Sequence, residues 1–310
     1  MTSPIEQTGI ESKPRSLPTL PFAAAFGALV MGAFAMGVSP VFVRAAEVGP
    51  FASAFWRVFL ALPVLLLWTI WEIRRTGLPY SAAWSFDRPI LLCGVFFAGD
   101  LFFWHLAILE TTIAHATLLA CLAPVWVALL SGAFIGEKVG RNVFAGLTLC
   151  LLGTGLLIGS SLRVDPERLI GDLYGVCTSV FFGVYFLAVR VARRKHGAGA
   201  MTFMSTTITA SILFFIAIAT GQSLIPQTLT GVAALLALGV FSHSGGQGLL
   251  AVALGSLSAA FSSLVIFIEA LAAAFFGWLV FSEALTPLQC AGGVLILAGI
   301  WIARPRNGAR

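Results

Sequence analysis

Asp100 is the first residue whose type and surroundings suggest binding chemistry, because it lies in a long apolar run. Phe97 precedes it by three residues and Trp104 follows it by four, so all three would share one face of a helix. An acid beside aromatic rings can hold an ammonium group and an apolar side chain together. The alternative is an acid near the outer third of a helix that is solvated from outside.

His243 and Gln247 form a second polar group, in the stretch SHSGGQG of another apolar run. They are also four residues apart. The glycines around them remove side chains, so another helix or a ligand can approach closely. The pattern predicts a binding face, with a glycine-packed helix that buries polar side chains as the alternative.

Two charged residues, Glu269 and Arg57, lie inside further apolar runs, where an unpaired charge is costly. Glu269 is near the middle of its run. It is interpreted as a proton-coupling group or a counter-ion for a substrate amine, and the alternative is a packing residue hydrogen-bonded to backbone. Arg57 is early in its run, where it either binds a carboxylate or, as we expect, extends to the outer interface.

Tyr185 lies in the middle of a run and is the preferred cavity residue among the remaining aromatic side chains. We expect His105 and His115 to lie at the outer interface rather than to bind substrate. The candidate substrate-binding residues are therefore Phe97, Asp100, Trp104, Tyr185, His243 and Gln247. Glu269 is the candidate for energy coupling.

The composition defines the scaffold that must position these side chains. Of 310 residues, 59% are hydrophobic and only 10% are charged, whereas soluble domains are roughly 45–50% apolar and about 25% charged. This excludes a soluble enzyme, a disordered protein and a disulfide-stapled secreted domain. A membrane span needs about 20 mostly apolar residues. The sequence has ten such runs, at 21–43, 50–71, 89–109, 112–135, 142–160, 170–191, 201–220, 230–252, 256–281 and 287–303.

The basic residues indicate how these runs cross the membrane. If the N-terminus is cytoplasmic, the inner segments hold 14 of the 18 Lys and Arg residues and the outer segments hold 3. Basic residues are retained on the cytoplasmic side, so both termini are expected there, in a multi-pass protein of the cell (inner) membrane. The net charge of +5 is therefore interpreted as topology, not as nucleic-acid binding.

Several kinds of chemistry lack their motifs. The five cysteines lie in apolar runs without a CxxC pair, so neither a disulfide nor a zinc site is expected. The sequence has no GxxxxGK[ST] phosphate loop and no HExxH motif. We therefore predict a protein that is not an enzyme and uses no metal or cofactor.

A shift of 146 positions aligns the two halves without gaps. Glu137 then falls on Glu283, Gly153 on Gly299, and Ala114 on Ala260. Each half carries five spans, and because five is odd the second copy starts on the opposite side and is inverted. Inverted repeats are typical of transporters that alternate access around a midplane site. Glycines that favour close packing of the fifth and tenth spans are Gly146, Gly153, Gly155, Gly292, Gly293 and Gly299.

The stretch 114–137, AHATLLACLAPVWVALLSGAFIGE, resembles the repeat unit of the drug/metabolite transporter superfamily in its ten-helix EamA branch, and 260–283 and 170–194 are similar to further parts of it. The resemblance implies an exporter of amino acids, related metabolites or toxic compounds that works without ATP. Many members have Glu-Pro in both the fourth and ninth helices. Here the first copy has Ala123-Pro124 and the second has Glu269-Ala270, which removes any symmetric pair of glutamates.

The predicted fold class is all-α integral membrane, with ten transmembrane helices as two inverted five-helix repeats. Pro40 and Pro124 are expected to kink the first and fourth helices. The expected organisation is a disordered cytoplasmic tail at 1–20, a first EamA-like repeat at 21–160, an outer linker at 161–169, a second repeat at 170–303 and a cytoplasmic tail at 304–310.

The predicted function is a secondary transporter or facilitator that exports small amphipathic metabolites, with amino acids, including aromatic ones, as the leading substrates. The third, fourth, eighth and ninth helices are expected to line its cavity, with the first and sixth moving against them. The partners are a small-molecule substrate and the lipid bilayer, and the oligomeric state stays open. Export of cationic drugs or toxic amines is the alternative, and an intramembrane enzyme or a scaffold is a further one.

Overall fold

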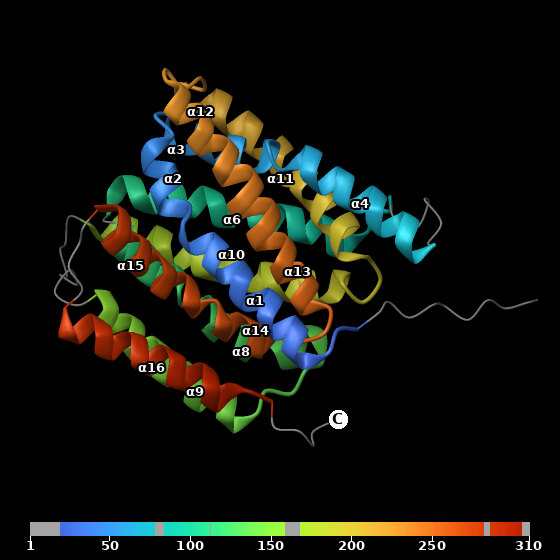
Figure 1. The fold of residues 1–310 in the computed structure, drawn as a ribbon, viewed down its shortest axis with the longest axis vertical. Coiled ribbons are helices and arrows are strands. Elements are labelled where there is room, and N and C mark those ends of the chain that lie inside the picture. Colours follow the sequence, from blue (N-terminus) through green and yellow to red (C-terminus); the bar gives the residue numbers. More distant parts are fainter. Residues whose placement is uncertain (1–18, 78–83, 112, 159–167, 282–285, 306–310) are drawn as a thin grey trace, which may run out of the picture.

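The structure, a computed structural model, describes residues 19–77, 84–111, 113–158, 168–281 and 286–305. The described residues contain helices and no strand, and the helices pack as one elongated bundle (Figure 1). The helices are α1 (Phe22–Gly37), α2 (Ser39–Ala45), α3 (Pro50–Phe59), α4 (Leu62–Thr76), α6 (Arg88–Glu110), α7 (Ile113–Ala120), α8 (Ala123–Ile135), α9 (Arg141–Ile158), α10 (Leu169–Ala192), α11 (Ala198–Ala219), α12 (Leu229–Ala237), η3 (Leu238–Gln247), α13 (Gly248–Leu254), α14 (Ala259–Val265), α15 (Phe267–Phe281) and α16 (Pro287–Ala303).

Eight helical segments among the described residues are long and apolar enough to cross a membrane. Two shorter apolar helices, 141–157 and 287–303, coincide with the predicted fifth and tenth runs. All ten predicted apolar runs are thus helical where the structure describes them. That all ten cross the membrane stays a prediction, and so does the side on which the termini lie.

Several spans are interrupted, and prolines explain three interruptions. Helices α2, α4 and α8 each carry a proline at their first or second position. Proline has no N–H group, so it is tolerated in a first turn but ends any helix that reaches it from upstream. Pro40 and Pro124 therefore break the first and fourth runs where the sequence predicts kinks, and Pro63 breaks the second.

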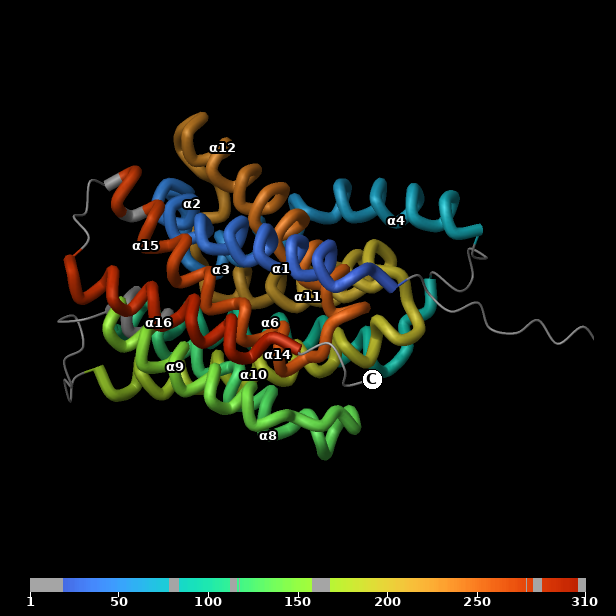
Figure 2. The backbone as a smooth tube through the Cα atoms, turned by 60° about the horizontal axis from the view of Figure 1, so that its bottom comes forward, coloured from blue at the N-terminus to red at the C-terminus, as the bar shows by residue number. Residues whose placement is uncertain are grey.

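The two ends of the bundle differ in what they hold. The start of α1 and the end of α16 lie at the same end, here called the terminal end (Figure 2). The turn between α2 and α3, at 46–49, lies at the opposite one, the far end. Because consecutive spans run in opposite directions, the 136–140 and 193–197 connections also lie at the terminal end. The two ends are distinguished because the cavity lies nearer to the far end.

Helices α9 and α16 cross at glycines, and their contacts are reciprocal. A Cβ atom added at Gly153 would lie 2.5 Å from the carbonyl oxygen of Gly292, and one added at Gly299 would lie 2.6 Å from that of Gly146. The 146-residue shift converts each of these pairs into the other. Such exchange is the contact pattern of two copies related by a two-fold axis. The predicted glycine packing is therefore present at Gly146, Gly153, Gly292 and Gly299. It is absent at Gly155, where an added Cβ atom has no neighbour within 4 Å, and at Gly293 the nearest neighbour is Leu271 of α15.

Two pairs of equivalent residues mark where this axis passes. Cys150 donates from its sulfur to the carbonyl oxygen of Ile296, its own equivalent, at 3.5 Å. The ring of Phe97 lies 5.4 Å from that of its equivalent His243. A residue meets its own equivalent only at the axis, so the axis runs from the α9–α16 contact to the contact between α6 and η3.

The α9–α16 contact generates a stability prediction. Gly153→Ala places a methyl group against backbone atoms of α16, and we expect overpacking to lower the free energy of unfolding by about 1–3 kcal/mol. Thermal unfolding of the detergent-solubilised protein measures this. Gly155→Ala is the matched control, since a Cβ atom there has no neighbour within 4 Å, and alanine alone favours a helix by about 1 kcal/mol. Equal melting temperatures for the two variants would contradict the account.

Candidate functional site

A cavity of about 920 Å³, counted out to its open mouth, lies in the middle of the bundle, toward the far end. Ligand sites combine apolar walls with a few polar groups, and the lining of this cavity has the same character. Its walls come from the first, second, third, fourth, sixth, eighth and ninth spans. The first, second and sixth therefore contribute as well, beyond the four spans predicted to line it.

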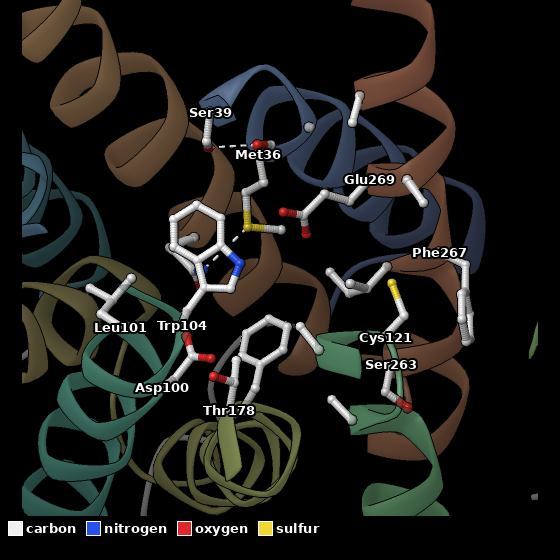
Figure 3. Close-up of a pocket in the computed structure, with 18 of the residues that line it drawn as sticks. Met36, Ser39, Asp100, Leu101, Trp104, Cys121, Thr178, Ser263, Phe267 and Glu269 are labelled. Atoms are coloured by element: carbon white, nitrogen blue, oxygen red, sulfur yellow. Dashed lines mark hydrogen bonds between the residues drawn. The ribbon is translucent and has the colours of Figure 1, made fainter. Parts of the chain in front are cut away.

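Five residues selected from the sequence lie on the cavity wall: Phe97, Asp100, Trp104, Gln247 and Glu269. Figure 3 shows Asp100 and Trp104 entering from one side, on α6, and Glu269 from another, on α15. The four-residue spacing on α6 thus brings the acid and the indole to the same space, as expected. An amphipathic molecule in this space would meet an acidic group from two directions.

Tyr185 and His243 are buried but lie one layer behind the wall. Tyr185 donates its hydroxyl hydrogen to Oε1 of Gln247 at 3.1 Å, and its ring centroid lies 4.8 Å from that of Phe97. His243 shares a 3.0 Å hydrogen bond between its Nε2 and the hydroxyl of Thr206. Both side chains therefore position the wall residues Phe97 and Gln247.

Gln247 ends η3, a π-helical segment among the α-helices of the eighth span. π turns inside longer helices are frequent at functional sites. The amide of Gln247 accepts from Tyr185 and donates from Nε2 to the sulfur of Met36 at 3.2 Å. Its orientation is therefore set by the sixth and first spans together.

Arg57 differs from its expected position at the interface. Its side chain is only 7% exposed and lines the cavity, so the expectation that it extends to the outer interface is wrong. The physical reason is the rotation of α3, which turns this side chain inward. Glu269 and Asp100 line the same cavity.

Other polar wall residues have no strong signal in the sequence. Thr178 lines the cavity from α10, and its buried hydroxyl has no hydrogen-bond partner among the described groups. Ser39 donates its hydroxyl to the carbonyl of Met36 at 2.6 Å (Figure 3). Threonine and serine are ordinary in membrane helices, so only their position on the wall reveals them.

His105 is buried rather than interfacial, which corrects the expectation for it. It is 1% exposed, and its Nδ1 lies 2.6 Å from the carbonyl oxygen of Leu101. The side chain of His115 lies outside the described residues. No group of three or more His, Cys, Asp and Glu side chains suited to a metal ion occurs in the described part of the chain.

A polar network ties the two halves together at the terminal end. Gly136, with a φ of 72°, ends α8 in the left-handed conformation that glycine adopts without strain. Glu137 follows it and accepts from Nε of Arg190 at 2.6 Å and from the backbone N–H of Ala259 at 2.9 Å. Arg190 also donates to the carbonyl of Leu254 at 2.7 Å. One carboxylate thus joins the fourth, sixth and ninth spans.

The network is separate from the cavity along α10. Thr178 precedes Arg190 by 12 residues, which is about 18 Å at 1.5 Å per residue. Arg193 reinforces the network by donating from Nε to the carbonyl of Ala251 at 2.8 Å. These contacts therefore join the spans at the terminal end, away from the cavity.

Residues 23–159 and 169–304 each match the EamA-like transporter family. The chain is 28% identical over 186 residues to an uncharacterized transporter of Archaeoglobus fulgidus, covering 60% of this chain and 63% of that protein. A second transporter of that organism is also 28% identical, with 66% of its length covered. The matches therefore span slightly less than two thirds of these relatives.

The pseudopaline exporter CntI of Pseudomonas aeruginosa is 29% identical over 214 residues, which cover 69% of this chain and 72% of the exporter. A solved crystal structure superimposes with a TM-score of 0.79 over 91% of this chain and 96% of its own, at 18% sequence identity. This similarity supports the fold of the bundle.

The hydrogen bonds of Glu137 lead to a prediction about access to the cavity from the terminal end. Glu137→Ala removes both contacts of the carboxylate. We therefore expect Cys121, which lines the cavity, to react about threefold to tenfold faster with a maleimide that is added from the terminal end. The assay uses a variant in which Cys121 is the only cysteine. Lys138→Ala, at the exposed neighbouring residue, is the control. An unchanged labelling rate in Glu137→Ala would show that the network does not close this end.

Proposed function

This chain belongs to the EamA-like transporter family, and from that premise we propose that it exports small amphipathic metabolites, with amino acids, including aromatic ones, as the main substrates. The observation that carries the proposal is the mid-bundle cavity, in which Arg57, Asp100 and Glu269 face a largely apolar space. Charged side chains inside a membrane bundle usually mark a substrate or ion pathway. The exporter among the relatives supports the direction of transport.

The aromatic walls support a substrate with an apolar side chain. The aromatic residues lining the cavity are Phe97, Trp104, Phe182, Phe186 and Phe267. Ring–ring contacts favour offset or tilted arrangements and contribute about 0.5–1.5 kcal/mol each beyond the burial of surface. Aromatic amino acids combine such a ring with the charged groups that the acids and Arg57 would meet.

Alternating access is the proposed mechanism. It is supported by the inverted arrangement of α9 and α16 and by the network that ties the terminal end while the cavity lies toward the far end. In the proposed topology ten helices cross the inner membrane, and the terminal end is cytoplasmic. Substrate would enter when Glu137 releases Arg190 and would leave from the conformation described here.

Export of cationic drugs or toxic amines is the second candidate. It is favoured by the excess of acids over basic groups in the cavity, where Asp100 and Glu269 face a single arginine. An amine without a carboxylate would use both acids and leave Arg57 without a ligand contact. The two candidates therefore differ in the use they make of Arg57.

Counterflow in proteoliposomes tests the proposed function. Vesicles that contain the purified protein and unlabelled phenylalanine should accumulate labelled phenylalanine from outside, and vesicles without protein should not. A panel of amino acids, amines and cationic dyes run in parallel ranks the candidates. Failure of every amino acid, with transport of dyes, would replace the first candidate by the second.

Glu269 is the proposed coupling residue, since it is a carboxyl group on the cavity wall near the middle of its span. We expect Glu269→Gln to lose the dependence of net transport on an imposed pH gradient. Counterflow should remain measurable, because exchange needs no net proton movement and Asp100 still lines the cavity. Glu110→Gln makes the same chemical change at an exposed position on α6 and should behave as wild type. Unaltered gradient dependence in Glu269→Gln would exclude this role.

A further inference from the structure

We propose that Arg57 binds the carboxylate of the substrate, while Asp100 and Glu269 face its ammonium group, so that the cavity selects free α-amino acids over the corresponding amines. This inference rests on the proposed function and specifies its substrate class. It assigns a binding role to a side chain that sequence reasoning places at the membrane interface.

The first support is that Arg57 is buried and incompletely bonded. Its side chain is 7% exposed, and its Nε atom has no hydrogen-bond partner among the described groups. A buried charged donor without a partner is destabilising. A ligand carboxylate that accepts from the guanidinium would remove this cost, and the planar fork suits two parallel hydrogen bonds.

The second support is that neither acid neutralises Arg57 by direct contact. Among the described residues, no ion pair within 4.0 Å joins Arg57 to Asp100 or Glu269. Asp100 and Glu269 nevertheless line the same cavity as Arg57. The guanidinium and the carboxylates therefore leave room for a molecule that carries both charges.

The third support is a neutral donor on the same wall. The hydroxyl of Thr178 is buried and has no partner among the described groups, and it lines the cavity together with Asp100 (Figure 3). A hydroxyl can donate to a carboxylate or accept from an ammonium group. Arg57 and Thr178 thus each bring a polar atom without a partner to the lining of the same cavity. A polar ligand could bond to both residues.

None of the three charged residues of the cavity has a charged equivalent in the other repeat. Under the 146-residue shift, Arg57 corresponds to Phe203, Asp100 to Gly246 and Glu269 to Ala123. The two repeats are thus related by symmetry, but their charged residues are not. This asymmetry suits a ligand with one positive and one negative end. Packing of the repeats alone does not require this asymmetry.

Competition in the counterflow assay tests the inference. The probe is labelled phenylalanine, and the competitors are unlabelled phenylalanine, phenylethylamine, which lacks the carboxylate, and phenylpropionate, which lacks the ammonium group. For the wild-type protein we expect phenylalanine to compete at least tenfold better than either analogue. In Arg57→Gln the preference for phenylalanine over phenylethylamine should fall at least tenfold, because only phenylalanine loses a charged contact.

Further variants separate binding from folding. Arg57→Lys keeps the charge but not the planar fork, and it should retain part of the preference. Arg44→Gln removes an exposed arginine of the first span and should leave the preference unchanged. A parallel loss of both ligands in Arg57→Gln, or a wild-type protein that does not distinguish phenylalanine from phenylethylamine, would overturn the inference.

Failure of the role of Arg57 and failure of the proposed function give different results in this assay. Wild-type protein that transports phenylalanine while Arg57→Gln keeps its preference overturns the role of Arg57 and leaves the proposed function standing. Wild-type protein that transports no amino acid overturns both.

Discussion

The cost of holding charge inside an apolar bundle is the constraint on which this structure depends. A guanidinium and two carboxylates away from bulk water must find partners, water or a ligand. Arg57, Asp100 and Glu269 meet this constraint by lining one cavity, where water or a ligand can reach them. Helices from both halves of the chain must therefore surround that cavity, and the rotation of each helix decides which side chains reach it.

The scaffold around these charges is symmetric, although the charges are not. Reciprocal glycine contacts between α9 and α16 and the meeting of Phe97 with His243 place the two halves around one axis. Glu137 and Arg190 join the halves at the terminal end, while Phe51 and Trp56 bond to the second half at the far end. Close backbone packing makes the α9–α16 contact rigid, whereas the partly exposed polar contacts between the halves can be exchanged for water. The structure thus combines a permanent contact with releasable ones.

The sequence allowed the general architecture and most of the cavity to be predicted, for physical reasons that differ between residues. Acids and an amide inside apolar runs are rare enough to identify Asp100, Gln247 and Glu269. The 146-residue shift predicted the repeat from small residues that the packing requires. Arg57 was assigned to the interface because the rotation of a helix about its axis cannot be derived from one arginine near its end.

Other parts of the site depend on contacts that one-dimensional patterns do not contain. Tyr185 and His243 are polar residues in apolar runs, as Gln247 is, yet their hydrogen bonds turn them away from the cavity wall. Thr178 and Met36 line the cavity but are common residue types in membrane helices. Their roles follow only from the packing of α10 and α1 against the third and eighth spans.

The orientation of a bound amino acid is the most direct measurement of the central claim. Phenylalanine labelled with ¹³C at its carboxyl carbon can be bound to protein carrying ¹⁵N-labelled arginine, and solid-state NMR then measures their separation. We predict that the carboxylate oxygens lie about 2.7–2.9 Å from guanidinium nitrogens, so that the labelled carboxyl carbon is close to a labelled nitrogen and gives a signal. Arg57→Lys should abolish this signal. Bound phenylalanine whose carboxylate lies remote from every arginine would contradict the prediction.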